Sequence, residues 1–228
     1  MSSNRALHNA YVVAAYLVIT CVMTYPLILH FTTMAPDWGG EGTMGLWNLW
    51  LFRHGLLHGS PFETSLLAPP FTVNLMFHTY TLSRDILALP LLTVLNPLTA
   101  SNLLTLLSFA FSGLAVWLLV RDLTSNTGAA FVAGLVYAFT PYRFAHLSGH
   151  YQLITIEWLA FYALYSLRYL RSGARRDGWL AALFALVTAL TDYYYALFLI
   201  VWTGLLALYR LIPRAERATT LRRIGLLL

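Results

Sequence analysis

The sequence has no lysine and few charged residues of any kind. Only 10% of its 228 residues are charged, whereas 59% are hydrophobic and 15% are aromatic, and the mean hydropathy is +0.66. Soluble domains carry about 25% charged residues, so this composition excludes an ordinary water-soluble domain. It predicts an all-α, polytopic integral membrane protein.

Cysteine is also scarce, because Cys21 is the only one and it lies inside an apolar run. An intramolecular disulfide and a cysteine-based metal site are therefore excluded. The 14 arginines give a net charge of +5, but most of them stand in short clusters at the ends of apolar runs. That placement is typical of membrane orientation signals, and no basic stripe interleaved with aromatics indicates a nucleic-acid partner.

The apolar runs predict about six transmembrane helices, since roughly 20 apolar residues cross a bilayer. The first is expected to be a retained signal anchor, because no small-residue cleavage site follows it. The expected spans cover about residues 10–29, 99–120, 127–140, 152–170, 179–191 and 193–212.

A long extracytoplasmic loop, residues 30–84, is expected after the first span. Within it, residues 43–58 have apolar side chains near helical spacing, which predicts an interfacial helix anchored by Trp47 and Trp50. Arg53, His54 and His58 should face water. Residues 66–74 contain two adjacent prolines and should be irregular or extended. Residues 83–95 are too short to span and are expected to be re-entrant or interfacial.

The arginines set the orientation under this scheme. Eleven lie on the amino-terminal side of the membrane and three on the other, so the positive-inside bias predicts a cytoplasmic amino terminus. Residues 213–228 become a cytoplasmic tail. The opposite, extracytoplasmic face then collects most of the acids and imidazoles: Asp37, Glu41, Glu63, Asp85, Asp192, His30, His54, His58, His78, His146 and His150. This segregation favours chemistry outside the cytoplasm.

The first candidate site is the glycine-rich loop 36–48, which carries two of the nine acidic residues, Asp37 and Glu41, four positions apart. Carboxylates at this spacing would act as a base or share a divalent cation, Mg²⁺ or Mn²⁺. Trp38 and Trp47 would stack on a substrate. The alternative is an ordinary connection whose glycines make turns and whose tryptophans lie among lipid headgroups.

A second candidate lies in residues 141–152, between the third and fourth spans. Arg143, His146, His150 and Tyr142 stand close together there, where a phosphate would be held near the start of the following helix. The alternative is an arginine that meets lipid headgroups among interfacial aromatics.

Three further residues are secondary candidates. Glu157 is expected about one turn inside the fourth span, where a buried carboxylate requires a partner or a function, and Arg143 or a nearby histidine is the expected partner. Asp192 and Tyr193 form the turn between the last two spans, where an aromatic belt is the alternative to a ligand site. For His78 and the Arg84-Asp85 pair, a structural salt bridge is as strongly indicated as any functional role.

Several of these features together resemble a known family. The acidic motif in the first outer loop, the interfacial helix 46–57, the Asn96-Pro97 break and the run 138–146 (AFTPYRFAH) are similar to bacterial members of the GT-C superfamily of polytopic glycosyltransferases, near its mannosyltransferase and YfhO-like groups. The resemblance covers nearly the whole chain. GT-C enzymes usually have eight or more spans, so residues 1–228 are expected to form a single amino-terminal module of this kind, a truncated product, or a subunit that retains only this half.

The resemblance implies an enzyme of the cytoplasmic (inner) membrane that moves a sugar from a polyprenyl-phosphate donor to an acceptor hydroxyl. It makes Asp37 the essential aspartate, with Glu41 as a second acid or metal ligand. Arg143, His146 and His150 would hold the departing lipid phosphate. The alternative is a non-catalytic membrane subunit that binds lipid, pigment or partner proteins. A transporter ranks last, because the sequence shows no internal repeat.

Overall fold

The computed structural model describes residues 2–36, 41–75 and 78–211, and this part of the chain is mostly helical. The prediction of an all-α fold is confirmed at that level. The α-helices are α1 (Ser2–Met23), α2 (Glu41–His58), α3 (Leu82–Ala88), α4 (Pro97–Thr124), α5 (Thr127–Ala138), α6 (Pro141–Ala145), α7 (Tyr151–Ile154), α8 (Glu157–Ser172), α9 (Arg175–Ala189) and α10 (Tyr193–Leu211). Short 3-10 turns cover Leu27–His30 and Leu91–Thr93, and β1 (Glu63–Ala68) pairs antiparallel with β2 (Phe71–Asn74).

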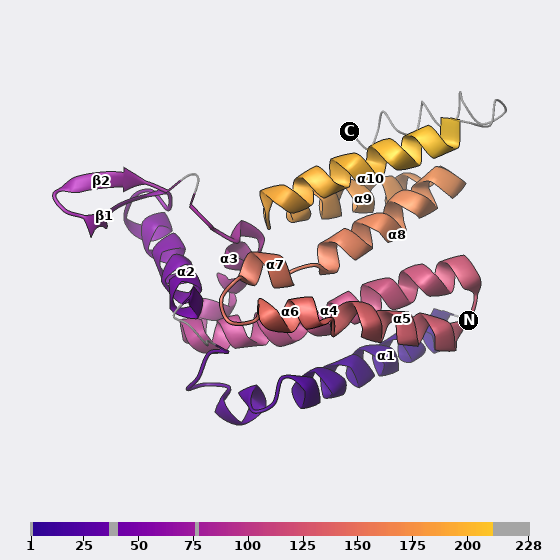
Figure 1. The fold of residues 1–228 in the computed structure, drawn as a ribbon, viewed down its shortest axis with the longest axis horizontal. Coiled ribbons are helices and arrows are strands. Elements are labelled where there is room, and N and C mark those ends of the chain that lie inside the picture. Colours follow the sequence, from indigo (N-terminus) through magenta and orange to yellow (C-terminus); the bar gives the residue numbers. More distant parts are fainter. Residues whose placement is uncertain (1, 37–40, 76–77, 212–228) are drawn as a thin grey trace.

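The long helices run back and forth along one direction (Figure 1). Helix α4 is central and packs against α1, α5 and α8, while α9 packs against α8 and α10. The β-hairpin, α2, α3 and α7 gather at one end of these helices (Figure 1), which we call the hairpin end. The α4–α5 and α8–α9 turns form the opposite end. We call it the arginine end because Arg121, Arg168, Arg171, Arg175 and Arg176 lie there.

Capping residues explain where the central helices begin and end. The Asn96 side chain accepts a hydrogen bond of 2.8 Å from the Thr99 amide, and Pro97 occupies the first turn of α4. Asn126 caps α5 in the same way. These are favoured residues for helix starts, because they satisfy amide donors that have no partner within the helix. Gly173, with a φ of 71°, ends α8 in the left-handed region that glycine adopts without strain.

A close approach of three helices joins α1 to the centre of the fold. The fully buried Tyr16 ring of α1 packs against Gly113 of α4 and Gly134 of α5, and its hydroxyl donates to the Phe131 carbonyl at 3.0 Å. A Cβ atom on Gly134 would overlap the Tyr16 hydroxyl and lie 2.6 Å from the Gly113 carbonyl oxygen. Glycine at both positions is therefore what admits the tyrosine.

Two helices of the described chain, α4 and α10, are long and apolar enough to cross a membrane. Helices also occupy the other four predicted segments, but α5 has only 12 residues and is about 18 Å long. That is shorter than the roughly 30 Å hydrocarbon core of a bilayer. Helix length and composition therefore do not confirm six spans.

Several boundaries differ from the sequence-based expectation. Helix α1 ends at Met23 instead of continuing to residue 29, because Pro26 has no amide hydrogen to donate to the preceding turn. The expected fourth span is divided into α7 and α8, so Glu157 is the first residue of α8 and does not lie a turn inside it. Residues 66–74 are extended, as predicted, and belong to the hairpin.

A helix is present over residues 43–58, as predicted, and it forms α2; its interfacial position remains a prediction. Arg53, His54 and His58 are exposed, as expected. The other face is buried against the protein, through Asn48, Leu49 and Phe52 among others. Residues 83–95 form α3 and a 3-10 turn, and neither is long enough to span.

Candidate functional site

Residues 37–40 of the acidic loop lie outside the described residues, and they include Asp37 and Trp38, so the roles predicted for these two residues remain predictions. Glu41 is the first residue of α2, and its side chain is also outside the described part of the structure. Met44 and Gly45, one turn further along α2, line a cavity. Trp47 is partly buried, and its ring meets the His78 ring edge-on, with centroids 6.2 Å apart.

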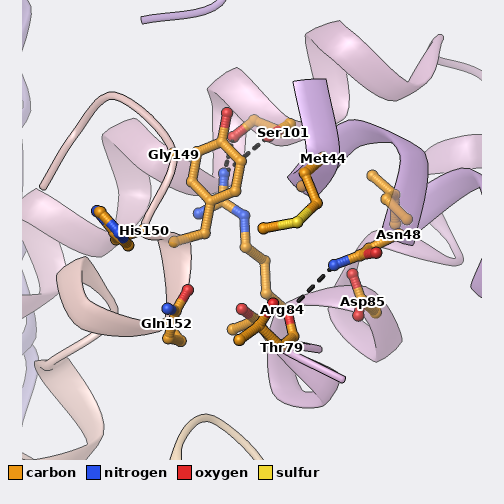
Figure 2. Close-up of a pocket in the computed structure, with 13 residues that line it drawn as sticks. Met44, Asn48, Thr79, Arg84, Asp85, Ser101, Gly149, His150 and Gln152 are labelled. Atoms are coloured by element: carbon orange, nitrogen blue, oxygen red, sulfur yellow. Dashed lines mark hydrogen bonds between the residues drawn. The ribbon is translucent and has the colours of Figure 1, made fainter. Parts of the chain in front are cut away.

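This polar cavity, of about 220 Å³, lies at the hairpin end between α2, α3, the first turns of α4 and the chain at 149–152. Figure 2 shows its side chains converging from these four segments. Its polar lining residues are Asn48, Thr79, Thr81, Arg84, Asp85, Ser101, His150 and Gln152. Among the predicted site residues that the structure describes, only His150 lines this cavity, opposite Met44 and Gly45 of α2.

Arg84 is the cation of the polar cavity, and only 6% of it is exposed. Its Nη2 donates to the Ser101 carbonyl, to Ser101 Oγ at 3.0 Å and to Thr105 Oγ1 at 2.6 Å (Figure 2 shows the Ser101 contacts). The guanidinium lies 4.4 Å from the centre of the Tyr151 ring, a favourable cation–π arrangement. All of its hydrogen bonds to described residues leave from Nη2, so Nε and Nη1 have donors available to a ligand.

Asp85 is the anion of the same cavity and is only 4% exposed. Its Oδ2 has no hydrogen-bond partner among the described residues, and no ion pair joins it to Arg84 in that part of the chain. The structural salt bridge weighed for this pair is therefore not formed. Burial raises the pKa of Asp85 from 3.8 to about 7, although Arg84 opposes the rise. Burial and the Asp85 charge also raise the pKa of Tyr80 to about 12.

Asn48 links α2 to the segment before α3. Its Nδ2 donates to the Thr79 carbonyl at 3.1 Å, and its Oδ1 lies 2.9 Å from His78 Nε2. Since the amide oxygen accepts, His78 carries its hydrogen on Nε2. Burial lowers the pKa of His78, which favours the neutral imidazole. These contacts fix the wall of the polar cavity beside Asp85.

A second, apolar cavity of about 260 Å³ adjoins the polar one and shares Arg84 with it. Leucines and a phenylalanine dominate its lining: Leu87, Leu91, Leu104, Leu107 and Phe111. Arg84 therefore stands at the junction of a polar and an apolar space. A molecule with a charged head and a hydrocarbon tail has this distribution of polarity.

Arg143, predicted to hold a phosphate, is fully buried. Its guanidinium donates to the carbonyls of Ala138 at 3.0 Å and Ile154 at 2.5 Å and to Ser108 Oγ at 2.9 Å. Ser108 Oγ in turn donates to Glu157 Oε2 at 2.6 Å. Glu157 thus meets Arg143 through Ser108, and in this structure the arginine joins helices and does not face the polar cavity.

The remaining predicted residues lie around the hairpin end. The Nδ1 atoms of His146 and His150 are 3.1 Å apart, and the Tyr142 ring meets His146 at a centroid distance of 4.5 Å. Asp192 and Tyr193 line a third hollow of about 230 Å³. No group of three or more histidine, cysteine or acidic residues suited to a metal ion occurs within the described residues. A divalent cation at Asp37 and Glu41 remains a prediction.

Comparisons of the chain with protein-family models, with curated proteins and with solved structures find no match. Sequence reasoning left two central residues of the polar cavity, Arg84 and Asp85, undecided and missed Asn48 and Gln152. One signal was available, because an adjacent pair of opposite charges opens a short apolar segment that cannot span a bilayer.

Proposed function

We propose that the chain is a multi-pass membrane protein, in which α1, α4, α5, α8, α9 and α10 form the membrane-embedded bundle. Helix α10 supports this, because it exposes a broad apolar face: Phe198, Ile200, Val201, Trp202, Leu205, Leu208 and Tyr209. Lipid would cover this face at little cost. The arginine end would be cytoplasmic by the positive-inside bias. The hairpin end, with both cavities, would be extracytoplasmic.

We propose further that the protein is a glycosyltransferase that takes a sugar from a polyprenyl-phosphate-linked donor. The observation that carries this proposal is the position of Arg84 between a polar and an apolar cavity. The prenyl chain would occupy the apolar cavity, and the phosphate would accept hydrogen bonds from Nε and Nη1 of Arg84. Charge-assisted bonds of this kind are about twice as strong as neutral ones. The sugar would then extend into the polar cavity.

The transfer would invert the anomeric centre. The acceptor oxygen forms a bond to the anomeric carbon while the bond from that carbon to the phosphate oxygen breaks, and the phosphate leaves with the bonding electron pair. Asp37 would take the proton of the acceptor hydroxyl, a contribution of typically about 10²–10⁴ in rate. Arg84 would stabilise the charge that develops on the phosphate. A divalent cation held by Asp37 and Glu41 would supply further charge neutralisation.

Transfer from a radiolabelled polyprenyl-phosphate hexose in vesicles that contain the purified protein tests this function. Arg84→Gln should lower donor binding at least tenfold, since it removes the charge at the junction, while Arg53→Gln on the exposed face of α2 should leave binding unchanged. Asp37→Asn should abolish transfer and keep donor binding. Equal binding by wild type and Arg84→Gln would refute the proposed donor site, and unchanged turnover by Asp37→Asn would refute its chemistry.

A non-catalytic membrane subunit is the second candidate, because the exposed face of α10 would also suit a neighbouring membrane protein. The same vesicle experiment separates the two. A subunit would bind the lipid without transferring the sugar, and it would migrate in mild detergent as part of a larger complex from its native membrane. An active, monomeric protein would refute the subunit hypothesis.

A further inference from the structure

Asp85 is the carboxylate that lines the polar cavity, and one of its oxygens has no hydrogen-bond partner in the described structure. Its Oδ2 is buried and unpaired. Leaving a buried polar atom unpaired is costly, and native structures do so rarely. The cavity beside it provides about 220 Å³, whereas one water needs only about 10–15 Å³. The space therefore admits a ligand much larger than one water.

The groups around Asp85 define the chemistry of that ligand. Asn48 and Gln152 line the same cavity, and an amide side chain both donates and accepts hydrogen bonds. Thr79 and Thr81 line it as well. Carboxylate, amide and hydroxyl groups placed together suit a molecule with several hydroxyls, each of which also donates and accepts. An anionic group would be held at Arg84 and repelled at Asp85.

From this arrangement we infer that Asp85, with Asn48 and Gln152, forms a subsite that binds hydroxyl groups of the sugar on the lipid donor. A sugar hydroxyl donates to Asp85 Oδ2 and removes the unpaired acceptor. This inference rests on the proposed function, because it assumes a donor whose phosphate lies at Arg84. The inference assigns a role to the Asp85 carboxylate: it distinguishes the sugar-bearing lipid from the bare polyprenyl phosphate that remains after transfer.

The preference between these two lipids is the quantity to measure. Dissociation constants of polyprenyl phosphate and of polyprenyl-phosphate hexose would be determined for the whole protein in lipid nanodiscs at pH 7.5. The wild type should prefer the hexose lipid by roughly 10- to 100-fold, the range expected for a hydrogen bond to a charged group. Asp85→Ala should reduce this preference to about threefold or less and leave binding of bare polyprenyl phosphate equal or tighter.

Asp85→Asn keeps the volume of the side chain and provides a second test if the alanine variant fails to fold. It should weaken the hexose preference by roughly tenfold, because the acceptor loses its charge. Asp177→Asn, on α9 at the arginine end, is the matched control and should retain the wild-type preference.

The outcomes separate the inference from the proposed function. If the wild type binds neither lipid, the proposed function fails, and the subsite fails with it. If both lipids bind and Asp85→Asn and Asp85→Ala keep the full hexose preference, only the subsite is refuted. A preference lost equally in the Asp177→Asn control would also refute it, because the effect would then not come from the cavity.

Discussion

Replacing Glu157 by glutamine tests whether the buried Arg143–Ser108–Glu157 network holds the fold together. Arg143 is fully buried and Glu157 is 4% exposed, so each charge depends on the other across Ser108. Glutamine keeps the size of the side chain and its contact with Ser108 but removes the negative charge. Removal of one partner from a buried pair costs about 3–5 kcal/mol. Because the pair is bridged by a hydroxyl, we expect the lower end of that range, about 3 kcal/mol.

The assay is thermal unfolding in mild detergent, followed by the loss of helical circular dichroism. Domains of this size shift by about 2–4 °C per kcal/mol, so Glu157→Gln should lower the midpoint by about 6–12 °C. Arg143→Met should be comparably destabilising, because it leaves the carboxylate unpaired. The double variant has neither charge and should be more stable than the worse single variant.

Asp122→Asn provides the control at the arginine end. Asp122 pairs with Arg168 at 3.1 Å and with Arg171, but these side chains are 24–40% exposed. Its loss should cost less than about 1 kcal/mol. Additive losses in the Arg143→Met/Glu157→Gln double variant would refute the argument for a coupled buried network. Loss of phosphate binding by a folded double variant would instead support the phosphate role predicted for Arg143 from sequence.

Gly134→Ala should lower the unfolding midpoint by several degrees, because its Cβ would overlap the Tyr16 hydroxyl. Gly128→Ala is the control, since its Cβ would meet only an Asn126 oxygen at 3.6 Å and the midpoint should not fall. Equal midpoints for the two variants would contradict this packing. The raised pKa of Asp85, about 7 against 3.8, means that the folded state binds more protons between these values. Stability should therefore fall as pH rises from about 4 to 7, by at most about 4 kcal/mol, and level off above pH 7. Midpoints of wild type and Asp85→Asn measured over this range should converge at low pH, and parallel profiles would refute the assignment.

The sequence was sufficient to locate the helices, because apolar runs and their terminators are local signals. Asn96, Pro97 and Asn126 act within four residues of themselves, and they stand at the starts of α4 and α5. The number of membrane spans does not follow from such local signals. The short helices α5 and α9 carry apolar sequences, but their length alone does not decide whether they cross a bilayer.

The polar cavity could not be assembled from the sequence, because its contacts join distant segments. Arg84 reaches Ser101, 17 residues away, and stacks on Tyr151. Adjacent residues on a helix point in different directions, so the neighbouring Asp85 lies on the side of Asn48 and forms no ion pair with Arg84 in the described part of the chain (Figure 2). The adjacent charges left a salt bridge as one of two equal alternatives, and the direction of the side chains decided against it.

The distribution of buried charge argues that the hairpin end has a function beyond folding. In the described chain, the four buried charged side chains are Arg84, Asp85, Arg143 and Glu157, and all lie at or near this end. Arg143 and Glu157 are joined through Ser108 and connect α4, α6 and α8. Arg84 and Asp85 have no such mutual compensation, and each has hydrogen-bonding capacity left within one cavity. Burying a charge that is incompletely paired opposes folding, and such charged groups cluster where ligands bind. The Arg84–Asp85 cavity is therefore where a bound ligand would recover the most free energy.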